Sequence, residues 1–135
     1  MSHTATGRRT AAPAVVTALR VLSVLTVVAI VWQFVTAGSL VAGGPGGESA
    51  EGLHAAGAIV LHVVSGLSMV AAALVWRGGA ALWPLIVAAL VFVLSFLQAY
   101  LGSHGPINVH VPGAMVLTVG AVLVAAWSFT GAVRR

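Results

Sequence analysis

Residues 51–62 read EGLHAAGAIVLH and open a long apolar run, and a related stretch, HVPGAMVL at residues 110–117, opens the last apolar run. When the two stretches are aligned on His54 and His110, five of eight positions are identical. Each histidine is followed three residues later by a glycine, Gly57 or Gly113, which lies on the same side of a helix. The sequence therefore predicts two equivalent helix starts, each with a histidine next to a glycine, which has no side chain.

The composition predicts a membrane protein. The chain has 135 residues, of which 60% are hydrophobic and 6% are charged, whereas a soluble domain carries about 25% charged residues. The net charge of +4 comes from arginines that flank the apolar runs, which is typical of membrane orientation signals and not of nucleic-acid binding. Since the chain has no cysteine, disulfides, iron–sulfur clusters and thiolate ligands are excluded.

Four apolar runs predict four membrane-spanning helices, at about 14–37, 52–76, 80–102 and 108–131, because each has the roughly 20 residues that a bilayer core requires. We expect an all-α integral membrane protein with an up-down four-helix bundle over residues 13–135. Residues 1–12 are polar and predict a disordered cytoplasmic tail. The first run is longer than the roughly 7–15 residues of a cleaved signal peptide, so we expect it to be retained.

The charges predict the orientation. All six arginines flank the same side of the four predicted helices (Arg8, Arg9, Arg20, Arg77, Arg134 and Arg135), and Arg20, inside the first run, can extend back to the interface. Both acids, Glu48 and Glu51, lie in the opposite loop. By the positive-inside rule both termini are cytoplasmic, in the inner (plasma) membrane of a bacterial cell.

The two helix pairs have similar features. Gln33 lies near the outer end of the first helix, and Gln98 lies near the outer end of the third. Together with the two histidine stretches, this pattern favours a parallel 2+2 internal repeat about an axis along the membrane normal. The alternative is chance similarity between two stretches of biased composition.

The matched histidines favour a haem site. In an up-down bundle the second and fourth helices are diagonal neighbours, so His54 and His110 can take the two axial positions of one b-type haem. We expect Gly57 and Gly113 to leave room for the flat macrocycle. Two alternatives stay open: ordinary helix packing by small residues, or zinc or copper bound by the histidines and Glu51.

Other polar residues have less defined roles. His62 lies two turns deeper than His54, where it could bind a cofactor, relay protons or replace His54 as ligand; alternatively it hydrogen-bonds Ser65, Ser95 or Gln98. Glu51 is expected in a first helical turn, as a helix-dipole partner or a catalytic acid–base group. His104 is expected in the outer loop.

Three motifs resemble one four-helix half of the haem A synthase family: Glu51-x-x-His54, Gln98-x-x-Leu101-Gly102, and His110. The resemblance implies that His54 and His110 face haem and that Glu51 takes part in substrate oxidation. Family enzymes have eight helices in two halves, so the resemblance implies that a haem-hydroxylating enzyme would need two copies of this chain. The chain also resembles small four-helix membrane proteins of high-GC bacteria, to which its Ala, Val, Gly and Arg bias points.

The sequence thus predicts a membrane haem-binding protein with His54 and His110 as ligands and Gly57, Gly113, His62 and Gln98 around the cofactor. It would serve electron transfer, haem handling, or a respiratory or oxidase-assembly complex. The first alternative is a cofactor-free membrane scaffold or accessory subunit, and the second is a haem-hydroxylating enzyme active as a dimer. The expected partners are the lipid bilayer and a second copy or a larger membrane complex, and not nucleic acid.

Overall fold

A computed structural model describes residues 10–43 and 47–134, and all regular structure within them is helical. The elements are α1 (Pro13–Ala42), α2 (Gly47–Arg77), α3 (Trp83–His104), α4 (Ile107–Ser128) and a short 3₁₀ helix, η1 (Gly131–Arg134). Each of α1 to α4 is long and apolar enough to cross a membrane. The predicted all-α class with four helices able to span a membrane is therefore confirmed. Most of the predicted tail, residues 1–9, lies outside the described residues.

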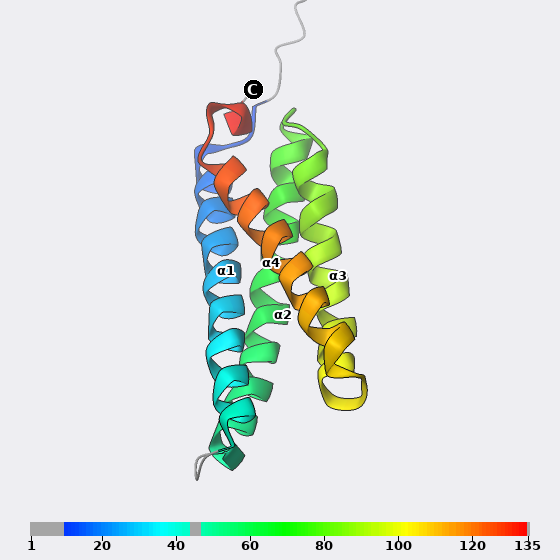
Figure 1. The fold of residues 1–135 in the computed structure, drawn as a ribbon. Helices are drawn as coiled ribbons and strands as arrows, with labels where there is room; N and C mark the ends of the chain where they lie inside the picture. The colour runs from blue at the N-terminus through cyan, green and yellow to red at the C-terminus, as the bar shows by residue number, and fades with distance from the viewer. Residues whose placement is uncertain (1–9, 44–46, 135) are drawn as a thin grey trace, which may run out of the picture.

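The helices form a closed ring. The packed pairs are α1–α2, α2–α3, α3–α4 and α4–α1, so α2 and α4 lie diagonally. The start of α1, the α2–α3 turn and the end of α4 lie at one end of the bundle (Figure 1), which we call the terminal end. The end of α1 and the start of α4 lie at the opposite end, which we call the loop end.

The helix ends differ from the predicted ones by up to five residues. The glycine- and serine-rich stretch after Ala37 remains helical to Ala42, where Gly43 adopts a left-handed φ of 63° and donates its N–H to Leu40 O. Next, α2 begins at Gly47 and not at 52, so Glu51 lies one turn inside the helix. His104 is not in a loop, because it is the last residue of α3.

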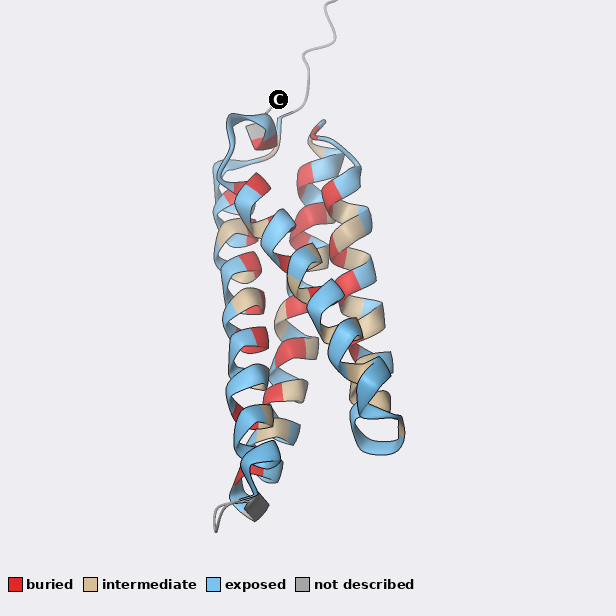
Figure 2. Cartoon of the chain, viewed as in Figure 1, coloured by how far each residue is buried: buried red, intermediate tan, exposed pale blue. Residues whose placement is uncertain are grey.

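The hydrophobic core lies towards the terminal end. The larger cluster of buried residues occupies that end and comprises Val16, Leu19, Ala71, Ala72, Val75, Ala80, Ala88, Val124, Trp127 and Val133. A smaller cluster lies in the middle and comprises Ala29, Ile30, Leu61, Val91 and Ala121. No residue from 96 to 116 is buried. The ribbons of the pair α1–α2 and the pair α3–α4 diverge towards the loop end (Figure 2), where α2 and α4 begin.

The two helix pairs have similar patterns of buried positions. Five buried residues of α2 have a buried residue of α4 56 positions later: Leu61/Leu117, Ser65/Ala121, Ser68/Val124, Ala71/Trp127 and Ala72/Ser128. Every buried residue of α3 has a buried counterpart in α1 65 positions earlier: Leu19/Pro84, Ser23/Ala88, Thr26/Val91 and Ile30/Ser95. Corresponding helices therefore present the same side to the interior, as a 2+2 repeat would require.

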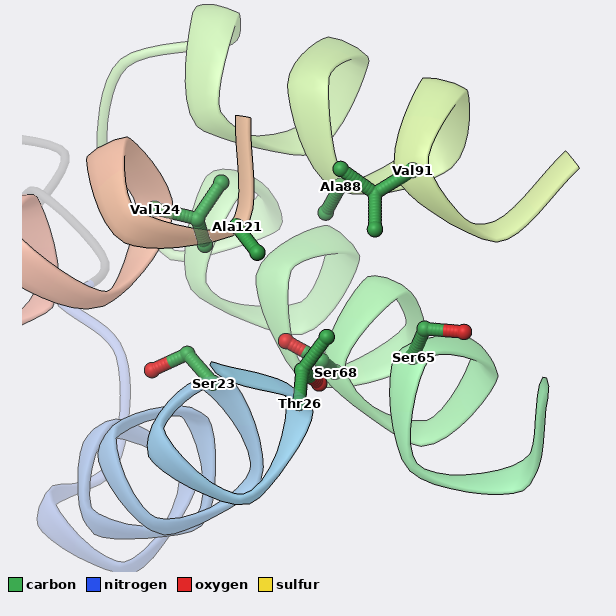
Figure 3. Close-up of a pocket in the computed structure, with 8 residues that line it drawn as sticks. All are labelled: Ser23, Thr26, Ser65, Ser68, Ala88, Val91, Ala121 and Val124. Carbon is green, nitrogen blue, oxygen red and sulfur yellow. The ribbon is translucent and has the colours of Figure 1, made fainter. Parts of the chain in front are cut away.

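A small cavity lies in the middle of the bundle (Figure 3). Its volume is ≈ 10 Å³, about what one water molecule requires. Four residues with hydroxyl groups line it from α1 and α2: Ser23, Thr26, Ser65 and Ser68. The residues at the corresponding positions of α3 and α4 line the other side: Ala88, Val91, Ala121 and Val124. Since alanine and valine fill the equivalent positions, packing does not require the hydroxyls. The cavity contains none of the predicted site residues.

Arg20 joins α1 to the end of α4. Its Nε donates to the backbone oxygen of Ser128 at 2.9 Å, and its Cζ lies 5.4 Å from the ring centre of Phe129. The last carbonyls of a helix lack partners within the helix and carry partial negative charge, so a cation stabilises them. Arg20 thus acts as a side-chain cap for α4.

We expect Arg20→Met to destabilise the bundle by about 1.5–3 kcal/mol, the usual contribution of a hydrogen bond to a charged group. The matched control is Arg77→Met, because Arg77 is exposed and ends α2. Denaturant titration in detergent micelles measures both variants. Equal stability of the two variants would contradict the capping role of Arg20.

Candidate functional site

His54 is held against α1 by Thr36. Its Nδ1 lies 2.9 Å from Oγ1 of Thr36, which also lies 3.0 and 3.1 Å from the backbone oxygens of Trp32 and Gln33. While the threonine hydroxyl donates to one of these carbonyls, its oxygen accepts and Nδ1 carries the imidazole hydrogen. This arrangement favours the tautomer in which Nε2 has a free lone pair, the state in which a histidine binds a metal.

His110 is the counterpart on α4, and it lacks such an anchor. Its ring packs on the backbone of α3 at Gly102, where an added Cβ would lie 3.0 Å from His110 Cε1. Its Nδ1 is buried and has no hydrogen-bond partner among the described residues. The repeat position of Thr36 is Leu101, which offers no hydroxyl. A buried unpartnered nitrogen is unfavourable, so this ring is suited to bind a group that the chain itself does not supply.

The structure brings the two histidines to the same end of the bundle. His54 lies near the start of α2 and His110 near the start of α4. They lie at the loop end, where the helix pairs diverge and no hydrophobic cluster fills the interior. Each ring packs against the neighbouring helix of its own pair, His54 against Thr36 of α1 and His110 against Gly102 of α3. Two histidines at one end of a bundle are a donor set that could hold a haem.

The glycines have neighbours that the sequence did not predict. A Cβ on Gly57 would collide with Gln33 Nε2 and would lie 2.7 Å from Trp32 Cδ1. A Cβ on Gly113 would collide in the same way with Gln98 Nε2 and would lie 2.9 Å from its Cδ. Each helix pair thus packs a glutamine over a glycine. Room for a macrocycle at these glycines remains a prediction, and it requires the glutamine side chains to move.

The two glutamines make different contacts. Gln33 Nε2 donates to the backbone oxygen of His54 at 3.1 Å, which fixes the start of α2 against α1. Oε1 of Gln98 is buried and has no partner among the described residues. Gln98 and His110 therefore give the second helix pair two unpartnered buried atoms. The recurrence of one glutamine in each pair was the only sequence signal for this packing.

His62 does not lie with the histidine pair. Its Nδ1 lies 2.8 Å from Ser95 Oγ, and its ring stacks on Phe96 with centroids 4.0 Å apart and planes at 12°. His62 therefore faces α3, whereas His54 faces α1. The contact with Ser95 is one of the alternatives considered from sequence.

Two further residues are peripheral. Glu51 is exposed on α2, one turn before His54. The ring of His104 is exposed at the end of α3 and stacks on Tyr100, with centroids 5.0 Å apart. In the described part of the chain, no three His, Cys, Asp or Glu side chains come together to hold a metal ion. This arrangement does not favour a zinc or copper site made by the histidines and Glu51.

No protein-family model, curated protein or solved structure matches the chain. The likeness to half of haem A synthase therefore depends on the short motifs alone. Any function assigned to this chain must rest on the chemistry of its own residues.

Proposed function

We propose that this chain is an integral protein of the bacterial plasma membrane that binds one b-type haem at the loop end through His54 and His110. The observation that carries this proposal is the placement of two histidines near the starts of two diagonal helices, where His110 Nδ1 is buried and has no partner among the described residues. Haem of this kind supplies a one-electron couple between ferrous and ferric iron.

Two residues of the chain would position His54 as a haem ligand. Thr36 fixes the His54 ring and keeps its hydrogen on Nδ1, so Nε2 is presented to the iron without a change of tautomer. Gln33 fixes the backbone at His54. The arginines at the terminal end and the acids near the loop end make the loop end the outer face, so the site would lie near the outer surface. This position suits electron transfer, haem handling or a subunit of a respiratory or oxidase-assembly complex.

A cofactor-free scaffold is the second candidate, and one observation favours it. Gln33 and Gln98 already fill the space in front of Gly57 and Gly113, so close helix packing explains the glycines without a ligand. The two candidates differ in whether the purified protein carries haem.

Haem content decides between them. Protein purified in detergent from haem-supplied cells should give a b-type pyridine haemochromogen, with one haem per chain. Protein without haem would overturn the proposal and favour the scaffold. An oxygen-dependent mass change of extracted haem would instead reveal the haem-hydroxylating alternative, for which Glu51 is the candidate acid–base group.

Thr36→Val tests the role of the His54 anchor. Valine keeps the shape of the buried side chain and removes the oxygen that holds Nδ1. Loss of an outer hydrogen bond to a metal ligand typically lowers affinity by about 10–100-fold, so we expect faster transfer of haem to apomyoglobin by a similar factor. Ser39→Ala is the control, because Ser39 is exposed on the same helix and bonds only Val35 O. Equal transfer rates for both variants would contradict the role of Thr36.

A further inference from the structure

The contacts of His62 in the middle of α2 favour one tautomer. The hydroxyl of Ser95 lies 2.6 Å from the backbone oxygen of Phe92 and 2.8 Å from Nδ1 of His62. While the serine donates to Phe92, its oxygen accepts from Nδ1 of His62, and Nε2 is then a hydrogen-bond acceptor.

This acceptor has no partner in the chain. Nε2 of His62 makes no hydrogen bond with the described residues and is not among the buried unpartnered atoms, so it is accessible from outside the helix pair. The surrounding medium at mid-membrane is hydrocarbon, where no water is present to satisfy a polar group. An ionisable side chain there is by default a candidate functional group. The missing partner must be a hydrogen-bond donor that dissolves in lipid.

Aromatic rings adjoin His62 on α3. Phe92, Phe96 and Tyr100 follow one another at intervals of four residues and lie along one side of the helix. The His62 ring stacks on Phe96, and Phe92 meets Phe96 edge-on, with centroids 5.2 Å apart. Phe96 is 49% exposed and Tyr100 is 61% exposed. We call Phe92, Phe96 and Tyr100 the aromatic strip; it offers a flat apolar ligand a surface open to lipid.

We propose that His62 and the aromatic strip bind the ring of a lipid-soluble hydroquinone. One hydroquinone hydroxyl donates to His62 Nε2, and the ring packs against the strip, for which aromatic contact is favourable. The oxidised quinone has no hydroxyl to donate, so this tautomer of His62 discriminates in favour of the reduced form. The site lies on α2 and α3, does not involve His54 or His110, and does not depend on haem.

Retention in lipid nanodiscs tests the site. The full chain is placed in discs of zwitterionic lipid, equilibrated with decylubiquinol kept reduced or with decylubiquinone, and the bound amount is compared with that of empty discs. We expect about tenfold more specific retention of the quinol, the effect of one hydrogen bond. Equal retention of both forms would overturn the proposal, because only ring packing or lipid partition would then remain.

Variants locate the binding. His62→Phe keeps a ring to stack on Phe96 and removes the acceptor, so quinol retention should fall to the level of the quinone. The control is Ser103→Ala, which changes an exposed residue of α3 outside the aromatic strip, bonded to Ala99 O, and should retain quinol like the parent. Undiminished retention by His62→Phe would also overturn the site. Haem content is measured on the same samples. Protein without haem should retain as much quinol as protein with haem. The quinol proposal and the haem proposal can therefore be refuted independently of each other.

Discussion

Alanine at His54 or at His110 is expected to abolish the low-spin spectrum of the proposed haem. Each substitution removes one of the two proposed axial ligands, and a single imidazole leaves the iron with one open position. The reduced α and β bands of purified protein, recorded per mole of chain, measure the loss. We expect both variants to lose these bands completely, with haem either released or converted to a high-spin form.

Two other histidines serve as controls for this result. His104→Ala should keep the spectrum, because His104 is exposed and stacks on Tyr100 away from the pair. His62→Ala should also keep it, because His62 bonds Ser95 on α3 and not the site. Loss of the bands in His62→Ala, with retention in His54→Ala, would make His62 the ligand and contradict the proposed pair.

Alanine at Gly57 is expected to destabilise the protein, whereas alanine at Gly52 on the same helix is expected to stabilise it. A Cβ at Gly57 meets the amide of Gln33 and the ring of Trp32, and a Cβ at Gly52 meets nothing within 4 Å. Overpacking costs about 1–3 kcal/mol, while replacing an unhindered helical glycine by alanine contributes about 0.5–1 kcal/mol of stability. The free energy of unfolding in detergent micelles measures both effects.

The same substitution can be made in the second helix pair. Gly113→Ala should cost less stability than Gly57→Ala, because a Cβ at Gly113 meets only the flexible end of Gln98, whereas a Cβ at Gly57 also meets the ring of Trp32. Gly57→Ala should also loosen the haem site, since Gln33 holds the backbone of His54. If Gly57→Ala and Gly52→Ala shift stability in the same direction, the Gln33 side chain does not occupy the space in front of Gly57.

The four spans could be predicted because each apolar run is as long as a bilayer is thick. The helix ends could not, because residues 38–42 and 47–51 combine glycine and serine with helical backbone, a composition that otherwise favours a loop. The end of α1 is set by Gly43, whose φ lies in the left-handed region. The sequence alone does not distinguish Gly43 from the other glycines near it.

The position of His54 and His110 at the same end of the bundle could be predicted, because each opens one of two similar stretches. The partners of each ring could not, since they come from other helices: Thr36 on α1 for His54, and the backbone at Gly102 on α3 for His110. The same holds for Gly57, whose partner Gln33 lies on α1. His62 could have been separated from His54 by the helical repeat alone, because eight residues rotate a helix by about 80° from the starting side.

The most direct test of the central claim is the near-infrared magnetic circular dichroism spectrum of the oxidised, purified protein. The energy of its porphyrin-to-iron charge-transfer band reports the pair of axial ligands. We predict a low-spin band at the position of two imidazoles, absent from both His54→Ala and His110→Ala. A protein that carries no haem, or a band typical of high-spin iron with one imidazole, would contradict ligation by His54 and His110.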